Sequence, residues 1–327
     1  MTKISNLLSK KNSNSILVIG DIILDEYIKG VSERLSPESP VPIVNVNEIS
    51  YNLGGAANVS NNIHNLKNQV FTIGLIGKDP DGKKIINIFK KNKIKTTGLI
   101  STNMFNTIKK TRVIGNNYQI VRYDKEDKFF NNNIEKSLLK KFDILIKKVQ
   151  LVIISDYGKG VCSPNLTQYV IKNCNKKNIK ILIDPRKKFN NFDNYRNAYL
   201  ITPNLYECRL LYPNLKNFDK EIEKVLFLIK DTYNIRNILI TRSEKGMSLL
   251  NKDNNISHYK SESKDIFDVS GAGDTVIATL GVLLSNKINL QMATKISNYA
   301  AGIVISFYGT IPVKLNLLIK KIKEERL

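Results

Sequence analysis

The feature that most constrains the fold is a series of short, almost wholly apolar runs separated by stretches with helical periodicity. A strand that is apolar on both faces must be covered by helices on both sides, as in parallel sheets. We therefore predict an α/β fold, a three-layer sandwich with a mainly parallel central sheet. The apolar runs are 15–23, 70–77, 151–157, 179–185, 199–204 and 237–243, and helical patterns lie at 82–92, 134–148, 164–176 and 219–232.

Polar side chains follow many of these apolar runs. Asp21, Asp156, Asp184, Asn204 and Ser243 each come at or just after the end of one. Because ligands bind at the carboxyl ends of the strands in open α/β sheets, we predict the functional site at this edge.

Two segments depart from the rhythm of buried strands. Residues 41–50 alternate between polar and apolar, and 108–124 reads as a hairpin that turns at 115–117. We expect a small accessory sheet outside the main layer, built from lid segments at about 32–50 and 106–124, which also pairs two subunits as a homodimer. The stretch SERLSPESPVP, residues 32–42, reads as a proline-rich connector into it. With no linker or repeat, 1–327 is predicted to be a single domain.

Composition excludes several classes of protein. No apolar run is long enough to span a bilayer, so we expect no membrane partner. The three cysteines, Cys162, Cys174 and Cys208, have no CxxC spacing, which favours reduced thiols and a cytoplasmic protein.

The net charge of +22 leaves a role in binding nucleic acid open. The lysines are scattered through every segment and no aromatic-plus-basic motif occurs, so we expect no nucleic-acid partner. A basic surface also raises the encounter rate with phosphorylated substrates.

The strongest chemical candidate is DVSGAGDT, residues 268–275. Gly271, Ala272 and Gly273 place small residues at a helix start, where free N–H groups bind anions. Asp274 lies in the same first turn, and a carboxylate beside an anion site suits phosphoryl transfer. A glycine-rich helix start with an acidic first turn is the alternative interpretation.

Two further motifs have both a functional and a structural interpretation. In NLGGAANVSNNI, residues 52–63, Gly54 and Gly55 allow close approach to a ligand and Asn58 offers a donor and an acceptor. A tight turn that begins a helix explains them equally. Asn204 and Glu207 have a spacing that suits water-bound Mg²⁺, and also that of an N-terminal capping box.

A second glycine-rich stretch, residues 77–84, has the spacing of a nucleotide-binding P-loop. Lys84 stands where a serine or threonine would hold magnesium, and Asp79 and Asp81 place negative charge in the loop. We predict a polar strand-to-helix turn instead.

Together the motifs resemble those of the ribokinase-like (PfkB) carbohydrate kinases, which have a GG-x-x-N region early and a GAGD region late. The resemblance runs from about residue 15 to 310, with the motifs in the expected order. It implies the ribokinase-like fold with a small β-sheet lid.

Within the family, four stretches resemble the kinases that act on D-glycero-D-manno-heptose 7-phosphate. They are RLSPESPVP at 34–42, SDYGKG at 155–160, TRSEKGM at 241–247 and DVSGAGDT at 268–275. The resemblance implies ATP-dependent phosphorylation of the C1 hydroxyl to the 1,7-bisphosphate, for the synthesis of ADP-heptose and the lipopolysaccharide inner core. A kinase for another phosphosugar, such as fructose 1-phosphate or tagatose 6-phosphate, and a non-catalytic nucleotide-binding or nucleic-acid-binding protein are the alternatives.

The resemblance also implies roles for individual residues. Asp274 is the expected base, and the backbone of Gly271, Ala272 and Gly273 is expected to hold the transferring phosphoryl group. The sugar is expected to contact Asp21, Asp25, Arg34, Glu38, Gly54, Gly55, Asn58 and Asp156, and we assign its phosphate, by charge and location, to Arg112, Arg122 and Lys159. ATP is expected at Asn204, Thr241, Arg242, Ser243, Glu244, Gly246 and Asn298, with Mg²⁺ held by Glu207 through water.

The chain departs from the family pattern near its end. Phe307 replaces a lysine, which leaves open what that stretch contributes to the nucleotide site. Many relatives carry a second, nucleotidyl-transferring domain with an H-x-G-H motif. That motif does not occur here, so we expect no such domain and a separate nucleotidyltransferase downstream.

Overall fold

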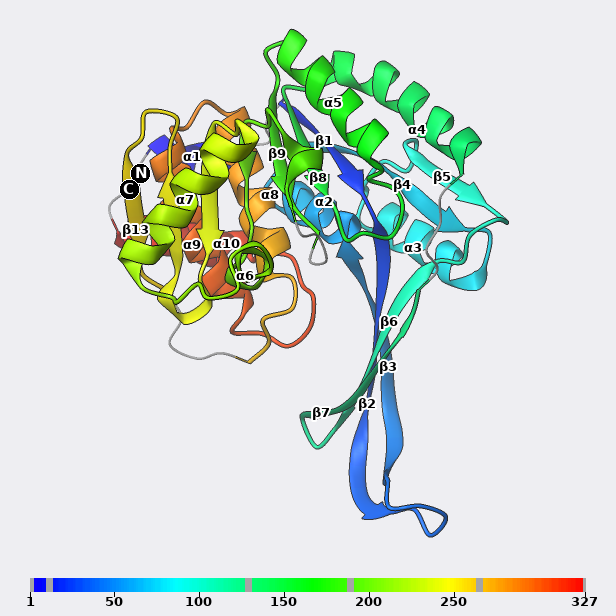
Figure 1. Ribbon diagram of the computed structural model, residues 1–327. Helices are drawn as coiled ribbons and strands as arrows, with labels where there is room; N and C mark the ends of the chain where they lie inside the picture. The colour runs from blue at the N-terminus through cyan, green and yellow to red at the C-terminus, as the bar shows by residue number, and fades with distance from the viewer. Residues whose placement is uncertain (1–2, 10–13, 127–130, 187–190, 263–266, 326–327) are drawn as a thin grey trace.

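The computed structural model describes residues 3–9, 14–126, 131–186, 191–262 and 267–325. These residues form an α/β body and a lid of long strands that projects from it (Figure 1). The predicted fold class is confirmed.

The sheet of the body has nine strands among the described residues, in the order β13-β12-β11-β10-β9-β8-β1-β4-β5. All neighbouring pairs from β11 to β5 are parallel, and β12 and β13 add antiparallel pairs at one edge. The strands are β1 Ser15–Gly20, β4 Gln69–Gly77, β5 Leu99–Thr102, β8 Leu151–Ser155, β9 Lys180–Asp184, β10 Leu200–Ile201, β11 Asn237–Thr241, β12 Met247–Leu250 and β13 Ile256–Tyr259.

Helices cover both faces of this sheet, which is why its central strands are buried and almost wholly apolar. In β1, Ile16 and Val18 pack into one core, while Leu17 and Ile19 pack into the other. The first face is covered by α1 Lys3–Ser9, α2 Ala56–Asn65, α3 Pro80–Lys91, α8 Ala272–Ser285, α9 Leu290–Val304 and α10 Leu315–Glu324; the second by α4 Asn132–Leu145, α5 Pro164–Lys176, α6 Leu205–Leu211 and α7 Asp219–Tyr233. Short 3₁₀ turns lie at Ile146–Lys148, Asp193–Tyr195 and Ser243–Lys245.

The lid is a four-stranded sheet in the order β3-β2-β6-β7. Its strands are β2 Ile22–Leu35, β3 Pro42–Gly55, β6 Ile108–Gly115 and β7 Tyr118–Lys125. Asn116 and Asn117 both have left-handed φ angles, of 51° and 69°, as a two-residue hairpin turn requires. The hairpin predicted over 108–124 is confirmed, and β2 and β3 extend beyond it to form the end of the lid (Figure 1).

The strand β2 is the main element that sequence patterns did not identify. We predicted one strand over 15–23, whereas β1 ends at Gly20 and β2 begins at Ile22. The part of the connector at 32–35 belongs to β2, so that prediction was wrong. The first residues of β2 are buried at the base of the lid and its last are exposed, so no single period runs through it.

The two faces of the lid differ in chemistry because side chains alternate along each strand. The inner face carries Asp25, Lys110, Arg112 and Arg122, which line a cavity. The outer face carries an apolar row across all four strands, in the registered order Ile49, Ile28, Val113, Val121.

The stretch at 77–84 is a strand-to-helix turn, as predicted. Asp79 caps α3, and its carboxylate accepts hydrogen bonds from the N–H groups of Gly82, at 2.7 Å, and Thr107, at 2.8 Å. The Asp79 carboxylate therefore binds a backbone N–H group that a P-loop would use to bind phosphate.

No helix among the described residues is both long enough and apolar enough to cross a membrane.

Candidate active site

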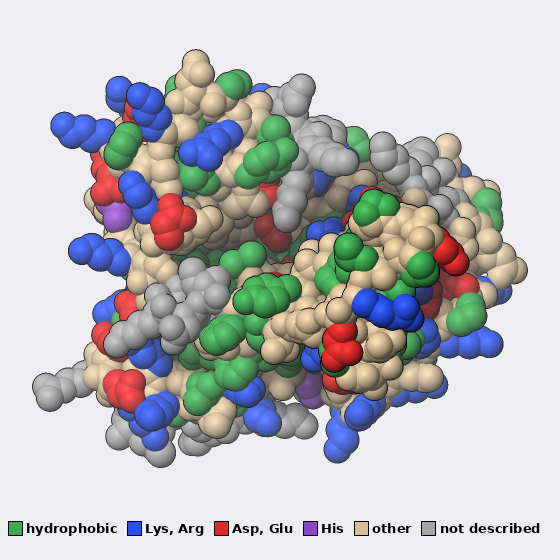
Figure 2. All heavy atoms as spheres, turned by 90° about the horizontal axis from the view of Figure 1, so that it is seen from below, with side chains coloured by type: hydrophobic (Ala, Val, Ile, Leu, Met, Phe, Trp, Pro, Cys, Tyr) green, Lys and Arg blue, Asp and Glu red, His purple; other side chains and the backbone are tan. Residues whose placement is uncertain are grey.

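A cavity of about 390 Å³ lies where the carboxyl ends of the sheet strands meet the base of the lid. Viewed from below, the molecule is hollowed at this junction, and acidic side chains are visible inside (Figure 2). The lining residues are Ile23, Asp25, Gly55, Lys110, Arg112, Arg122, Asp156, Tyr157, Asp184, Pro185, Thr202, Asn204, Glu207, Thr241, Val269, Ser270, Gly271, Gly273, Asp274, Val276 and Thr310.

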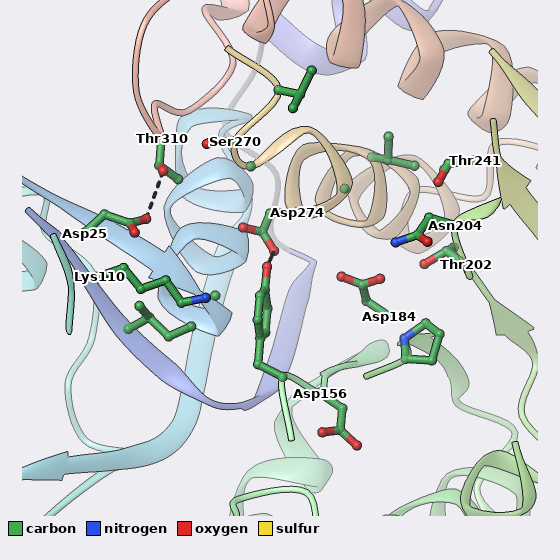
Figure 3. A pocket seen from close by; sticks show the side chains of 18 of the residues that line it. Asp25, Lys110, Asp156, Asp184, Thr202, Asn204, Thr241, Ser270, Asp274 and Thr310 are labelled. Atoms are coloured by element: carbon green, nitrogen blue, oxygen red, sulfur yellow. Dashed lines mark hydrogen bonds between the residues drawn. The ribbon is translucent and has the colours of Figure 1, made fainter. Parts of the chain in front are cut away.

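Asp274 lies at the middle of this cavity, in the first turn of α8 (Figure 3). Its Oδ2 accepts a hydrogen bond from Asn58 Nδ2 at 2.8 Å, and its Oδ1 accepts one from the Tyr157 hydroxyl at 2.9 Å. The residue is only 2% exposed, so its carboxylate reaches the cavity from a nearly solvent-free position.

The start of α8 presents backbone toward the same space. Gly271 has a left-handed φ of 80°, and a Cβ there would lie 2.8 Å from Asn58 Nδ2. At Gly273, by contrast, a Cβ would meet no atom within 4 Å. N–H groups in the first turn of a helix have no intrahelical partner, so this open face suits an anion.

Gly54 and Gly55 allow the chain to pass from the lid into α2 without a side chain in the way. A Cβ at Gly54 would lie 2.5 Å from Asp25 Oδ2, and one at Gly55 would lie 2.5 Å from the Asp21 carbonyl oxygen. Gly55 also has a left-handed φ of 57°. This close passage brings Asn58 against Asp274.

On the lid side of the cavity, Asp25 joins the lid to the loop that precedes α10. Its Oδ1 accepts a hydrogen bond from Arg112 Nη1 at 2.7 Å, and its Oδ2 accepts one from Thr310 Oγ1 at 2.8 Å. The Tyr27 hydroxyl oxygen accepts a hydrogen bond from the Thr310 N–H at 2.9 Å, and the Tyr27 ring lies under the Arg112 guanidinium. Although burial lowers the pKa of Arg112, the charge of Asp25 raises it, with a net upward shift.

Two more cations border this end. Arg122 forms a two-pronged contact with Asp124, at 2.8 and 2.6 Å, and still lines the cavity. Lys110 was not predicted; it lies 5.6 Å above the Tyr157 ring, and burial together with the nearby Arg122 lowers its pKa. The sequence contained a signal for Lys110: it lies two residues from Arg112 on a strand, so the two side chains face the same side.

The opposite end of the cavity is formed by the ends of β9, β10 and β11. Asp184, Thr202, Asn204 and Thr241 all point there in Figure 3. Asn204 and Glu207 form a capping box: Asn204 Oδ1 accepts from the Glu207 N–H at 2.9 Å, and Glu207 Oε2 accepts from the Asn204 N–H at 2.8 Å. The structural interpretation of that motif therefore holds, and both residues also line the cavity.

A family model described as pfkB family carbohydrate kinase matches residues 13–316. The chain belongs to this family of sugar kinases.

Curated relatives within the pfkB family support the assignment. Bifunctional protein HldE of Helicobacter pylori (strain HPAG1) is 42% identical over 296 residues, which cover 90% of this chain and 63% of that protein. The Bifunctional protein HldE of Aliarcobacter butzleri (strain RM4018) is 38% identical over 315 residues, covering 95% and 64%. The chain thus spans less than two thirds of the length of these relatives.

Solved structures of other proteins share the fold. Ribokinase of Arabidopsis thaliana complexed with ribose and ATP has a TM-score of 0.74 at 14% identity, covering 94% of this chain and 99% of that one. Phosphofructokinase-2 from Escherichia coli in complex with substrates and products has a TM-score of 0.77 at 15% identity, covering 95% and 99%.

Several residues predicted to bind the sugar lie outside the lining of the cavity. Asp21 is fully buried, and its carboxylate accepts hydrogen bonds from the backbone of the 157–161 loop. Arg34 and Glu38 are exposed at the far end of the lid, because β2 carries the chain away from the body. Lys159 does not line the cavity and pairs with Glu126.

Asp156 lines the cavity but points away from Asp274 (Figure 3). Its Oδ2 accepts a hydrogen bond from the Tyr195 hydroxyl at 2.7 Å, and its Oδ1 accepts one from the Gly158 N–H at 2.8 Å. Burial, and then the charge of Asp21, raise the pKa of Asp156 to about 7.

Most of the 241–247 segment predicted to bind ATP also lies elsewhere. Ser243 and Glu244 are exposed, and Gly246 closes the turn between β11 and β12 with a φ of 80°. Asn298 donates to the Lys260 carbonyl oxygen at 2.6 Å. Of this predicted set, Thr241 and Asn204 line the cavity.

Arg242 is a buried structural cation in this pfkB chain. It is 1% exposed, and its guanidinium donates to Asp219 Oδ1 at 2.6 Å, Asn217 Oδ1 at 2.8 Å and Ser248 Oγ at 2.8 Å. These contacts join β11 to β12 and to the start of α7.

We expect Arg242→Ala to lower the free energy of unfolding by about 2 kcal/mol, since hydrogen bonds to a charged group are lost. Urea denaturation measures this, and the KM for ATP should stay unchanged in the folded variant. Lys320→Ala, which removes an exposed ammonium paired with Glu324, is the control and should change stability by less than about 0.5 kcal/mol. A raised KM for ATP with unaltered stability would restore the predicted nucleotide role.

Proposed function

We propose that the chain transfers the γ-phosphoryl group of ATP to the C1 hydroxyl of D-glycero-D-manno-heptose 7-phosphate, giving the 1,7-bisphosphate. The observation that carries the proposal is the position of Asp274. It lies at the amino end of α8, between a lid end with three cations and a strand end with polar uncharged and acidic groups. An acceptor sugar phosphate and a donor nucleotide would meet at this carboxylate.

In this mechanism Asp274 accepts the proton of the attacking hydroxyl. Asn58 and Tyr157 donate to its two oxygens and hold it in place. As the hydroxyl oxygen attacks the γ-phosphorus and the bond to the β-phosphate oxygen breaks, the N–H groups of the α8 first turn face the phosphoryl oxygens. The open space at Gly273 allows the phosphoryl group to come within hydrogen-bonding distance.

We propose that ATP enters as its Mg²⁺ complex. The described residues contain no cluster of three or more His, Cys, Asp or Glu side chains suited to holding a metal alone. Asp184 and Glu207 line the nucleotide end and provide the oxygen ligands that Mg²⁺ prefers, directly or through water. A magnesium ion held there would neutralise phosphate charge during transfer.

The substrate phosphate is assigned to the inner face of the lid, where Lys110, Arg112 and Arg122 line the cavity. Arg112 is committed to Asp25, which leaves Lys110 and the exposed side of Arg122 as the stronger ligands. The choice of heptose among phosphosugars rests on the stretches at 34–42 and 155–160 and on the likeness to the HldE proteins.

Binding of nucleic acid is less well supported. In Figure 2 the Lys and Arg side chains are spread around the visible face rather than gathered into one patch.

Coupled ATP turnover against a panel of phosphosugars tests the proposal. We expect the highest kcat/KM for heptose 7-phosphate, and a loss of at least about a thousandfold in kcat for Asp274→Asn, because the amide cannot take the proton. Efficient turnover of fructose 1-phosphate, fructose 6-phosphate or tagatose 6-phosphate with none of heptose would overturn the substrate. Full activity of the variant would overturn the mechanism.

The phosphate site is tested with two adjacent lysines on opposite faces of β6. Lys110→Ala should raise the KM for the sugar phosphate by about tenfold or more and leave the KM for ATP unchanged, because a cation facing the phosphate is lost. Lys109, paired with Glu26 and Asp81 on the outer face, supplies the control variant Lys109→Ala. Equal effects of the two substitutions would contradict the assignment.

We also propose that the lid pairs two subunits. Its outer face has Ile49 and Val121 51% and 49% exposed in one registered row with Ile28 and Val113. An apolar sheet face of this kind is stable in water when a second copy covers it.

Sedimentation velocity should find a dimer that the double variant Ile49→Asp/Val121→Asp converts to monomer, because two charges would be buried in an apolar interface. Ile144 on α4 is 58% exposed and far from the lid in sequence and fold, so Ile144→Asp is the control and should stay dimeric. A monomeric unsubstituted chain would reject the pairing.

A further inference from the structure

Tyr157 contacts Asp274 from the end of β8, whereas Asn58 contacts it from α2. Tyr157 follows β8 at the carboxyl edge of the sheet, and its hydroxyl donates to Asp274 Oδ1 at 2.9 Å. Asn58 donates to the other oxygen, Oδ2, at 2.8 Å. The base is thus held at both oxygens, by one neutral amide and one neutral phenol.

The backbone of Tyr157 is itself fixed from beneath. Its N–H donates to Asp21 Oδ2 at 2.9 Å, and the N–H groups of Lys159 and Val161 donate to the same carboxylate at 3.1 Å each. Asp21 has no exposed surface. The loop after β8 therefore wraps around a buried carboxylate at the end of the central strand, which leaves Tyr157 little freedom to move away.

The surroundings keep the phenol in its donor form. Burial, and then the negative charge of Asp274, raise the pKa of Tyr157 well above its ordinary value. The titratable groups that face the contact are Asp184 at the end of β9 and Asp25 and Lys110 on the lid, while α2 contributes the neutral Asn58.

We propose that Tyr157 is a positioning residue that orients the Asp274 carboxylate and keeps it ionised, and that Asp21 serves this function by holding the Tyr157 backbone. The inference rests on the proposed role of Asp274 as the base. It assigns Asp21 a function different from the sugar contact predicted for it. A hydrogen bond to the ionised form of a carboxylate favours that form, so loss of the Tyr157 hydroxyl should make Asp274 harder to ionise.

Tyr157→Phe removes one oxygen and keeps the ring. We expect kcat to fall about tenfold, with the KM for ATP within about twofold, and the acidic limb of the kcat profile to move up by about one pH unit. Tyr169→Phe is the matched control: that hydroxyl also donates to a carboxylate, Asp143, but on the exposed surface of α5, so kcat and its pH profile should not change.

A readout without substrate separates this inference from the proposed reaction. The Asp274 carboxyl carbon, labelled with ¹³C and assigned with Asp274→Asn, is titrated by NMR in the free protein. An upward shift of its pKa in Tyr157→Phe supports the positioning role even where the panel of phosphosugars rejects heptose. An unchanged pKa together with an unmoved acidic limb overturns it.

The variant Asp21→Asn tests the same chain of contacts from below the cavity. It replaces an acceptor oxygen of the 157–161 loop by an amide, at a residue that does not itself line the cavity. We expect the acidic limb to move in the same direction as in Tyr157→Phe, with thermal unfolding used to confirm that each variant is folded. Should Tyr157→Phe not fold, Asp21→Asn decides alone, and an unshifted acidic limb in it rejects the inference.

Discussion

The arrangement of the active site depends on one buried carboxyl residue, Asp21, at the end of the central strand. Its carboxylate accepts hydrogen bonds from three N–H groups of the 157–161 loop, and its carbonyl oxygen accepts the N–H of Ala56 at the start of α2. Its own N–H donates to the Ser155 carbonyl oxygen. A buried charge is tolerated only when it is well hydrogen-bonded, so these contacts must all form together. They join β1, β8, the lid and α2 at one point.

Asp21 in turn positions the two residues that hold Asp274, the proposed base. Asn58 lies on the first turn of α2, which begins against Asp21, and Tyr157 begins the loop that wraps its carboxylate. The two glycines before α2 are required because a Cβ at either position would lie 2.5 Å from an oxygen of Asp21 or Asp25. The glycine motif is therefore a packing requirement as well as a way of opening space for ligand.

The two faces of the lid carry different kinds of side chain because side chains alternate along a strand. Residues two apart face the same side, so Lys110 and Arg112 face the cavity while Val113 faces the opposite side of the lid. One short strand therefore carries both cations of the proposed phosphate site and an apolar residue of the proposed subunit contact. The stretch RLSPESPVP lies at the far end of the two longest lid strands, away from the residues that line the cavity.

Local patterns in the chain predicted much of the body. The apolar runs predicted the parallel strands β1, β4, β8, β9, β10 and β11, because burial on both faces of a sheet leaves a continuous signal, and the helical periods predicted α3, α4, α5 and α7. The edge strands β5, β12 and β13 were not predicted. The turn at Asn116 and Asn117, and the Asp79 cap that fills the false P-loop, also follow from local chemistry.

The tertiary structure alone decided which polar residues meet. Asp21 follows β1, and Asp274 lies in the first turn of α8. The Asp21 carboxylate is enclosed by backbone N–H groups, whereas the Asp274 carboxylate faces the cavity. Arg242 lies in a motif that resembles a nucleotide site, but its guanidinium turns into the protein toward Asp219. Side-chain direction at a strand end depends on partners hundreds of residues away, as Thr310 and Asp25 show, and no local period encodes it. The sequence by itself therefore determined the parallel strands of the sheet, the lid hairpin and the family, whereas long-range hydrogen bonding determined which residues line the cavity.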